Sequence, residues 1–339
     1  MRRIIIIGLS IAVSAFFLWL VLRDVPMEAI LLRFQAADVG WLLACFFITT
    51  MALYTRGIRW RGLVDNRVSQ RDAFFMMGIT FMLNQLPLRA GEIARSLIAT
   101  RHSIPFLTAA TSILIERLVD TLLVVLAILI SISLLPNIPP EVARTAFIFG
   151  ILGIVAFITL IFIARKPAWF YALIEQIENK LPFLQKLPLK KFLTHILEGL
   201  QPMSRPQTLI HVLVWSLISW GLSFTAMWSL IMALGIVVAQ PVLAAVVTVA
   251  LASFSIAIPV SIAGIGPFEA AVVAGGSLVG MNEIEAISLG FLAHGLTVAV
   301  YVFWGVIGML GLGLSLSDVV GQQPDTQKTD SEYHDKVNE

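Results

Sequence analysis

Residues 107–135 read LTAATSILIERLVDTLLVVLAILISISLL, a run of 29 residues with only three charged side chains. A helix of about 20 mainly apolar residues is long enough to cross the roughly 30 Å hydrocarbon layer of a membrane. Within that layer each backbone N–H and C=O group needs a partner in the protein, and a helix satisfies these groups internally. This stretch therefore predicts a membrane-spanning helix.

The remainder of the chain has the same apolar character. Of its 339 residues, 58% are hydrophobic and 13% are charged, whereas about 25% of residues are charged in an average soluble domain. Further apolar runs occupy residues 4–22, 39–55, 145–164, 207–234 and 284–315. We expect an all-α polytopic integral membrane protein with about six full spans.

Cysteine usage and net charge exclude several classes of site. The only cysteine, Cys45, lies in an apolar stretch without a second thiol, so neither a disulfide nor a metal site is expected, and no cofactor is expected. The formal net charge of +2 does not indicate a nucleic-acid partner. Arg2 and Arg3 precede an apolar run to Leu22, as in a signal peptide, but no small-residue cleavage site follows. We expect an uncleaved first span.

The basic residues between the spans predict the orientation of the chain. One connection carries Arg56, Arg59, Arg61, Arg67 and Arg71. A second carries Arg165, Lys166, Lys180, Lys186, Lys190, Lys191 and Arg205. The alternating connections hold only Arg23, Arg33 and Arg144. Because basic loops stay on the cytoplasmic side, we expect both basic connections and both termini to be cytoplasmic.

Two segments are more polar than the spans. Residues 167–200 mix aromatic side chains with lysines and glutamates, which is typical of a helix lying on the cytoplasmic leaflet or of a solvated linker helix. Residues 318–339 are polar and acidic, and we expect a disordered cytoplasmic tail there. Residues 1–317 then form one transmembrane domain.

Two apolar regions are interrupted. Residues 72–101 form two short pieces broken at LPLRAGE (86–92), and residues 241–281 form two more, broken at Pro259 and AGIGPFE (263–269). Each half has about 15 residues, which is short for a full crossing. A pair of Gly/Pro-interrupted segments in corresponding positions of two halves is typical of a transporter binding site. We expect two re-entrant helical hairpins whose tips meet near the membrane midplane.

The two hairpins are expected to be inverted relative to each other. The first leaves the cytoplasmic side and three spans follow it, so the second enters from the outside. Both breaks share the order Pro, Ala-Gly, Glu. The alternative, that residues 241–258 and 266–281 are both full spans, stays open and gives eight spans.

Several ionisable side chains fall at apparent membrane depth, namely Arg89, Glu92, Arg95, Glu116, Arg117, Asp120, Glu269 and His294. A charge there costs several kcal/mol unless it is paired or hydrated, so each is a candidate functional residue. Arg89, Glu92 and Arg95 recur every three residues and share one helical face. Glu116 and Asp120 also share a face and repel each other, so we expect an arginine of the first hairpin between them.

The two breaks add the features of an anion site. The second half of each hairpin begins at the tip, so its free N–H groups and the positive end of its dipole point toward the midplane. Gly91, Gly264 and Gly266 let the backbone come close to a ligand. Arginine adds a planar pair of donors that matches phosphate. An anionic, oxygen-rich group such as phosphate is expected to bind here.

Three segments, 87–95 with its Arg-Ala-Gly-Glu core, 116–120 and 258–269, resemble the signatures of the lysylphosphatidylglycerol synthase transmembrane family. The resemblance covers nearly the whole chain and implies a stand-alone member of its flippase region. In larger members a cytoplasmic aminoacyl transferase follows this region. Because this sequence stops after the acidic tail, the resemblance implies translocation without synthesis, in the cytoplasmic (inner) membrane of a bacterium.

We therefore expect a lipid translocase, or flippase, that moves an anionic phospholipid or a polyprenyl-phosphate-type lipid between leaflets. The expected head-group site comprises Arg89, Gly91, Glu92, Arg95, Arg117, Gly264 and Gly266. Glu116, Asp120, Glu269 and His294 are expected either to carry coupling protons or to hold the arginines in place.

Two alternatives stay open, an intramembrane lipid-modifying enzyme and a non-catalytic membrane partner of a lipid synthase. The chain has neither His-Glu-x-x-His nor Gly-x-Ser-x-Gly, so we do not expect an enzyme. Besides the lipid, a second copy of the chain or a lipid synthase is a candidate partner.

Overall fold

The computed structural model describes residues 2–23, 25–86, 89–135, 140–180, 189–256 and 263–315. Within these ranges the regular elements are helices, and no strand occurs. The all-α prediction is therefore confirmed. The predicted tail, 318–339, lies outside the described residues, as do residues 87–88 and 257–262 of the two predicted breaks.

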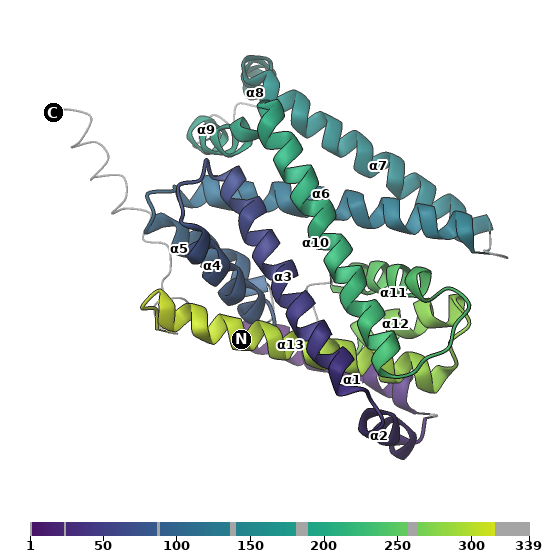
Figure 1. Ribbon diagram of the computed structural model, residues 1–339. Coiled ribbons are helices and arrows are strands. Elements are labelled where there is room, and N and C mark those ends of the chain that lie inside the picture. The colour runs from purple at the N-terminus through teal and green to yellow at the C-terminus, as the bar shows by residue number, and fades with distance from the viewer. Residues whose placement is uncertain are drawn as a thin grey trace.

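In the described part of the chain, six long helices overlap the six predicted spans (Figure 1). They are α1 (Arg2–Leu22), α3 (Val39–Leu63), α6 (Phe106–Leu134), α7 (Pro140–Arg165), α10 (Pro206–Ala233) and α13 (Glu283–Gly311). Over the described residues α3, α10 and α13 are each long and apolar enough to cross a membrane by themselves. The chain is a multi-pass membrane protein.

Short helices connect these elements. They are α2 (Met27–Gln35), α8 (Pro167–Lys180), α9 (Leu189–Leu200) and the 3₁₀ helix η3 (Gln201–Ser204). In Figure 1, α8 and α9 are seen nearly end-on at one end of the long helices. Leu197 and Leu200 of α9 are buried in a cluster with Leu63 and Ile115. This part of the segment predicted at the membrane interface therefore packs an apolar side onto the bundle.

The two interrupted regions form two helix pairs, as the sequence breaks predicted. The first pair is α4 (Gln70–Leu83) with α5 (Ala90–Thr100), and the second is α11 (Pro241–Ile256) with α12 (Pro267–Leu278). The first pair is closely packed because Gly91 has no side chain: a Cβ there would lie 1.9 Å from the Thr80 carbonyl oxygen. Gly91 therefore lets α5 approach α4.

The tips of the two pairs touch each other. The backbone N–H of Ala263 donates to the carbonyl oxygen of Gln85 over 3.0 Å. Both tips contain non-glycine residues in the left-handed backbone region, Arg89 with φ 52° and Ala263 with φ 56°. Such residues cost about 1–2 kcal/mol each, so the surrounding contacts must hold both tips in place.

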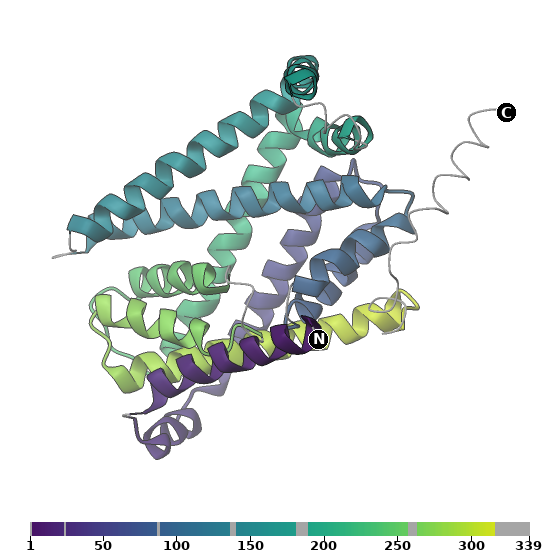
Figure 2. The same cartoon turned by 180° about the vertical axis from the view of Figure 1, so that it is seen from behind.

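Helix α13 packs against both pairs. A Cβ on Gly78 of α4 would lie 2.7 Å from the Trp304 carbonyl oxygen, and one on Gly308 would lie 2.7 Å from that of Phe75. On the second pair, a Cβ on Gly290 would lie 3.3 Å from the Cα of Glu269. Small residues permit such close helix packing in membranes. Figure 2 shows from behind that α1 runs beside α12 and α13.

The two basic connections lie at the same end of the molecule, because Arg205 donates through Nη1 to Asp65 Oδ1 over 2.7 Å. One part of the sequence interpretation needs correction. Helix α3 continues to Leu63 and α4 begins at Gln70, so four of the five arginines assigned to the first connection belong to helices and one stays in the connection. The four are Arg56, Arg59 and Arg61 of α3 and Arg71 of α4, and the one is Arg67. The end of α3 was predicted too early because the apolar run stops before the arginines, and arginines in a sequence are typical of a loop.

Candidate functional site

Arg59 is the centre of a buried ion-pair cluster. Its Nη1 lies 2.5 Å from Asp120 Oδ1, and its Nη2 lies 3.2 Å from Glu116 Oε1. Nη1 also donates to Ser216 Oγ over 3.0 Å. The Arg59 and Glu116 side chains are each only 3% exposed. We expected an arginine of the first hairpin between the two carboxylates, but this position belongs to Arg59 of α3.

Arg95 of α5 completes the buried part of the cluster. It donates through Nη2 to the second oxygen of Glu116 over 2.5 Å, and its guanidinium lies 5.3 Å from the centre of the Trp60 ring. Trp60 in turn donates to Ser112 Oγ over 3.0 Å. Arg95 is 2% exposed. Glu116 thus joins α3, α5 and α6 by accepting from two arginines.

A second set of ion pairs, more exposed than the first, lies at the first tip. Glu92 Oε1 accepts from Arg117 Nη2 at 2.8 Å and from Arg89 Nη1 at 3.4 Å. The two arginine side chains remain about one-third exposed, at 34% for Arg117 and 29% for Arg89. One carboxylate therefore holds two arginines that still reach open space.

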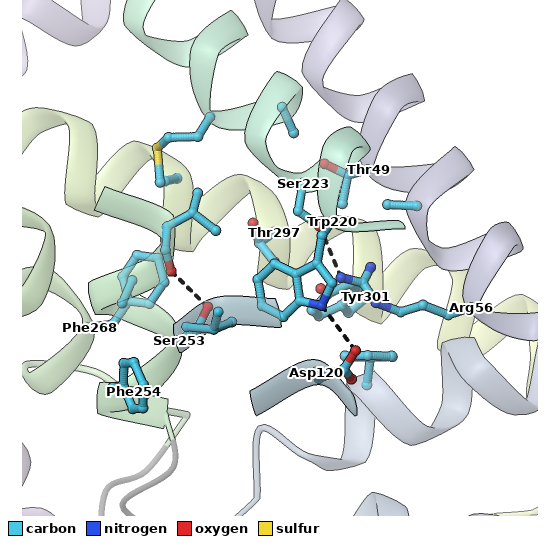
Figure 3. Close-up of a pocket in the computed structure, with 18 of the residues that line it drawn as sticks. Thr49, Arg56, Asp120, Trp220, Ser223, Ser253, Phe254, Phe268, Thr297 and Tyr301 are labelled. Atoms are coloured by element: carbon cyan, nitrogen blue, oxygen red, sulfur yellow. Dashed lines mark hydrogen bonds between the residues drawn. The ribbon is translucent and has the colours of Figure 1, made fainter. Parts of the chain in front are cut away.

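That space is a cavity of about 470 Å³. Its polar wall contains Arg56, Arg89, Arg117 and Asp120. Its apolar wall is formed by residues of α10, α11 and α12, among them Met227, Leu230, Val249, Phe254 and Phe268. Figure 3 shows Trp220 crossing the middle of the cavity, with Asp120 and Arg56 toward one side and Phe254 and Phe268 toward the other. The cavity is therefore amphipathic.

Arg56 is the cavity residue that the sequence interpretation missed. It donates through Nη2 to Ser223 Oγ over 2.9 Å, and its guanidinium lies 5.4 Å from the centre of the Phe81 ring. No carboxylate among the described residues forms an ion pair with it, and Asp120 is already bonded to Arg59 and to Trp220 Nε1. The spacing of Arg56 and Arg59, three residues apart on one helical face, was the available signal.

The cluster as a whole is positively charged. Four arginines share three carboxylates, and Arg56 adds a fifth cation; of these five arginines, Arg56, Arg89 and Arg117 line the cavity. The described part of the cluster therefore has two more cations than anions. An anion entering the cavity would reduce this excess.

Glu269 and His294 form a separate network at the second tip. Glu269 Oε2 accepts from the Gly266 N–H over 2.6 Å, and Oε1 lies 2.6 Å from His294 Nδ1. His294 Nε2 lies 3.0 Å from the Ala263 carbonyl oxygen. A Cβ on Gly266 would lie 2.8 Å from the Ser14 carbonyl oxygen, so this glycine lets α1 pack closely. Gly264 has φ 78°.

A family model described as the lysylphosphatidylglycerol synthase TM region matches residues 5–305. The chain belongs to this family. Comparison with curated proteins found no match, and comparison with solved structures found none either.

The region shared with the lysylphosphatidylglycerol synthase TM family contains the whole site. The three segments that suggested the resemblance are far apart in sequence and meet in space: the Arg-Ala-Gly-Glu segment begins α5, the segment 116–120 lies in α6, and the second tip precedes α12. Arg89, Asp120 and Phe268, one from each segment, line the same cavity. Membership of this family indicates a membrane protein concerned with lipids.

Proposed function

We propose that this protein is a lipid translocase that moves an anionic phospholipid or a lipid-linked phosphate between the leaflets of the bacterial cytoplasmic membrane. The observation that carries the proposal is Arg56, an arginine without a carboxylate partner among the described residues, in a cavity that is apolar on its other side. The head group would bind at the arginines, and the start of the lipid tails would contact the apolar wall.

The charge balance supports an anionic head group. An unpaired charge inside a membrane protein is costly and usually marks a substrate pathway. Arginine offers a planar fork of N–H donors that can bind two phosphate oxygens at once. Arg56, Arg89 and Arg117 all line the cavity, so a phosphate there could contact more than one of them.

Helix length supports the re-entrant arrangement of the two pairs. At about 1.5 Å per residue, the 14 residues of α4 extend about 21 Å and the 12 residues of α12 extend about 18 Å. Both lengths are below the roughly 30 Å of a hydrocarbon core. The bond between Ala263 and Gln85 supports a closed contact of the two tips beside the cavity.

The proposal includes a membrane orientation for the chain and excludes chemical change of the lipid. We place the basic connections and both termini on the cytoplasmic side because of the positive-inside rule. We assign the protein no catalytic step on the lipid. A second copy or a lipid synthase is a candidate partner.

The experiment is lipid movement in vesicles that contain only the purified protein. Fluorescent phosphatidylglycerol and fluorescent phosphatidylcholine are compared in separate vesicles, and the label in the outer leaflet is quenched with a membrane-impermeant reductant. We expect movement of the anionic lipid to exceed that of the zwitterionic lipid, with no change in lipid mass. Chemical conversion of the lipid without movement would favour an enzyme, and neither movement nor conversion would favour a non-catalytic partner. Either result would refute the translocase.

A further inference from the structure

The pair formed by Glu269 and His294 has an unusual set of hydrogen-bond partners. Both ring nitrogens of the histidine face oxygen atoms, Glu269 Oε1 on one side and the Ala263 carbonyl oxygen on the other. A carbonyl oxygen can only accept, so His294 Nε2 must carry a proton to make its bond. Glu269 is 1% exposed and His294 is 9% exposed, so water does not replace these bonds.

The other side of the ring requires a second proton. His294 Nδ1 and Glu269 Oε1 are 2.6 Å apart, so a proton must lie between them whether it belongs to the imidazole or to the carboxyl group. The pair is neutral overall in both cases. If it loses one proton, either two lone pairs face each other at Oε1 and Nδ1, or Nε2 loses its bond to Ala263. The two contacts can both be hydrogen bonds when one proton is shared between His294 and Glu269.

This proton affects the contact between the two tips. His294 Nε2 holds the carbonyl group of Ala263, and the N–H group of Ala263 donates to Gln85 of the first tip. Ala263 also occupies the left-handed region, with φ 56°, and needs its contacts to stay there. Loss of the proton therefore weakens one of two contacts at this tip: the bond of His294 Nε2 to Ala263, or the contact of His294 Nδ1 with Glu269, whose other oxygen accepts from Gly266.

The neighbouring elements bring no other described charge into this pair. Helix α11 has no ionisable residue. On α13, Glu283 and Glu285 lie more than two turns from His294, Glu285 is bonded to Arg33 of α2, and Tyr301 lines the cavity. On the side of α1, which packs at Gly266, the charged residue whose side chain the structure describes is Arg23, which follows the helix and lies over the Trp19 ring. In the adjacent α3 and the first tip, the charged groups are those of the arginine cluster, whose ion pairs involve Glu92, Glu116 and Asp120. Glu269 and His294 therefore form the proton-binding group at this tip.

We propose that Glu269 and His294 together bind one proton that holds the two hairpin tips in contact, so that opening of the tips releases this proton to water and couples lipid movement to proton movement. The coupling rests on the proposed function, whereas the proton site itself depends only on the geometry of the tips. On closure the pair takes up a proton from the opposite side of the membrane, so each cycle moves one proton across and needs no other reactant.

The first test measures the contact of the tips without any lipid assay. Leu86→Cys and Ile265→Cys place thiols on exposed neighbours of the two bonded tip residues. The initial rate of joining them with a short bismaleimide is divided, at each pH, by the rate at which a monofunctional maleimide labels the same thiols, because the reactive thiolate fraction rises with pH. This ratio is the crosslinking rate, and it is measured across the pH range in which histidine and carboxyl groups titrate. We expect this rate to fall at least about twofold as the pH rises. The wild type, which has only the buried Cys45, gives the background.

Glu269→Gln is the matched variant. Its amide can donate to a neutral His294 Nδ1 while its carbonyl oxygen accepts from Gly266, so it imitates the protonated pair without the carboxylate. We expect the crosslinking rate in this variant to change less with pH than in the parent protein and the thermal stability to stay near that of wild type. A flat rate in the parent protein overturns the proton site, whether or not the variant folds.

The second test separates the proton site from the proposed function. Vesicles with a trapped pH indicator should report proton movement together with lipid movement in wild type, and this coupling should be lost in Glu269→Gln. Lipid movement combined with a flat crosslinking rate refutes the proton site and leaves the translocase standing. A pH-dependent crosslinking rate without lipid movement supports the proton site and refutes the translocase.

Discussion

Arg59 of α3 donates to Asp120 of α6, with 2.5 Å between Nη1 and Oδ1, and the same guanidinium contacts Glu116 one turn earlier on α6. Ser216 of α10 accepts from it as well. A single side chain thus ties three helices together at the base of the cavity. Removing one partner of a buried ion pair leaves an uncompensated charge, which costs about 3–5 kcal/mol.

Arg59→Gln should therefore lower the free energy of unfolding by about 3–5 kcal/mol. Asp120→Asn should cost less in the Arg59→Gln background than in wild type, because the pair is already broken. Both effects are measured by thermal unfolding in detergent. Arg71→Gln is the control, since Arg71 is exposed on α4, and it should change stability by about 0.5 kcal/mol or less. Strictly additive losses would show that Arg59 and Asp120 do not interact.

Glycine positions give a second test of the packing. Gly91→Ala should be strongly destabilising, because its Cβ would lie 1.9 Å from the Thr80 carbonyl oxygen and the backbone of α4 would have to move. Gly221→Ala on α10 is the control: nothing lies within 4 Å of its Cβ, so stability should stay equal or rise by about 1 kcal/mol. Equal melting temperatures for the two variants would contradict the close approach of α5 to α4.

The sequence predicted the helices and the two breaks well, since apolar runs and Gly/Pro interruptions are local signals. Residues 86–92 and 263–269 were expected to end helices, and both regions do separate two short ones. The extension of α3 was missed because arginines normally favour water. Arg59 tolerates burial only because Glu116 and Asp120, about 60 residues away in sequence, neutralise it.

The kinds of residue at the site could be predicted from the sequence, but not which of them form ion pairs with each other. The sequence indicated that arginines and carboxylates pair, but it could not show which ones do, because partners on different helices have no fixed spacing. Gly91 and Gly266 were interpreted as ligand-contact glycines, and the structure gives both a packing role against Thr80 and Ser14. The bond between Glu269 and His294 spans 25 residues and depends on the position of α13 against α12.

Cysteine labelling can test the orientation. The ion pair of Asp65 with Arg205 places the two basic connections at one end, so a thiol at Asp65→Cys should react only with a reagent added on the cytoplasmic side. Val237→Cys, which is 90% exposed between α10 and α11, should react only from the outside. The two positions serve as controls for each other. Reversal of both patterns would overturn the orientation but not the fold.

The last prediction uses the difference between a forked cation and a point charge. Arg56→Lys keeps the positive charge in the cavity but loses the planar pair of donors that a phosphate would use. We expect movement of fluorescent phosphatidylglycerol to fall about tenfold, which corresponds to about 1.4 kcal/mol.

Arg71→Lys, on the exposed side of α4, is the matched control and should move lipid at the wild-type rate. Melting temperatures and protein content per vesicle are measured for both variants, so that a folding defect is not mistaken for lost binding. Arg56→Gln should reduce movement further than Arg56→Lys, because it removes the charge as well as the fork. Wild-type rates in both Arg56 variants would show that the head group does not bind at this arginine, because the substrate would then gain nothing from the one cavity cation that lacks a described carboxylate partner.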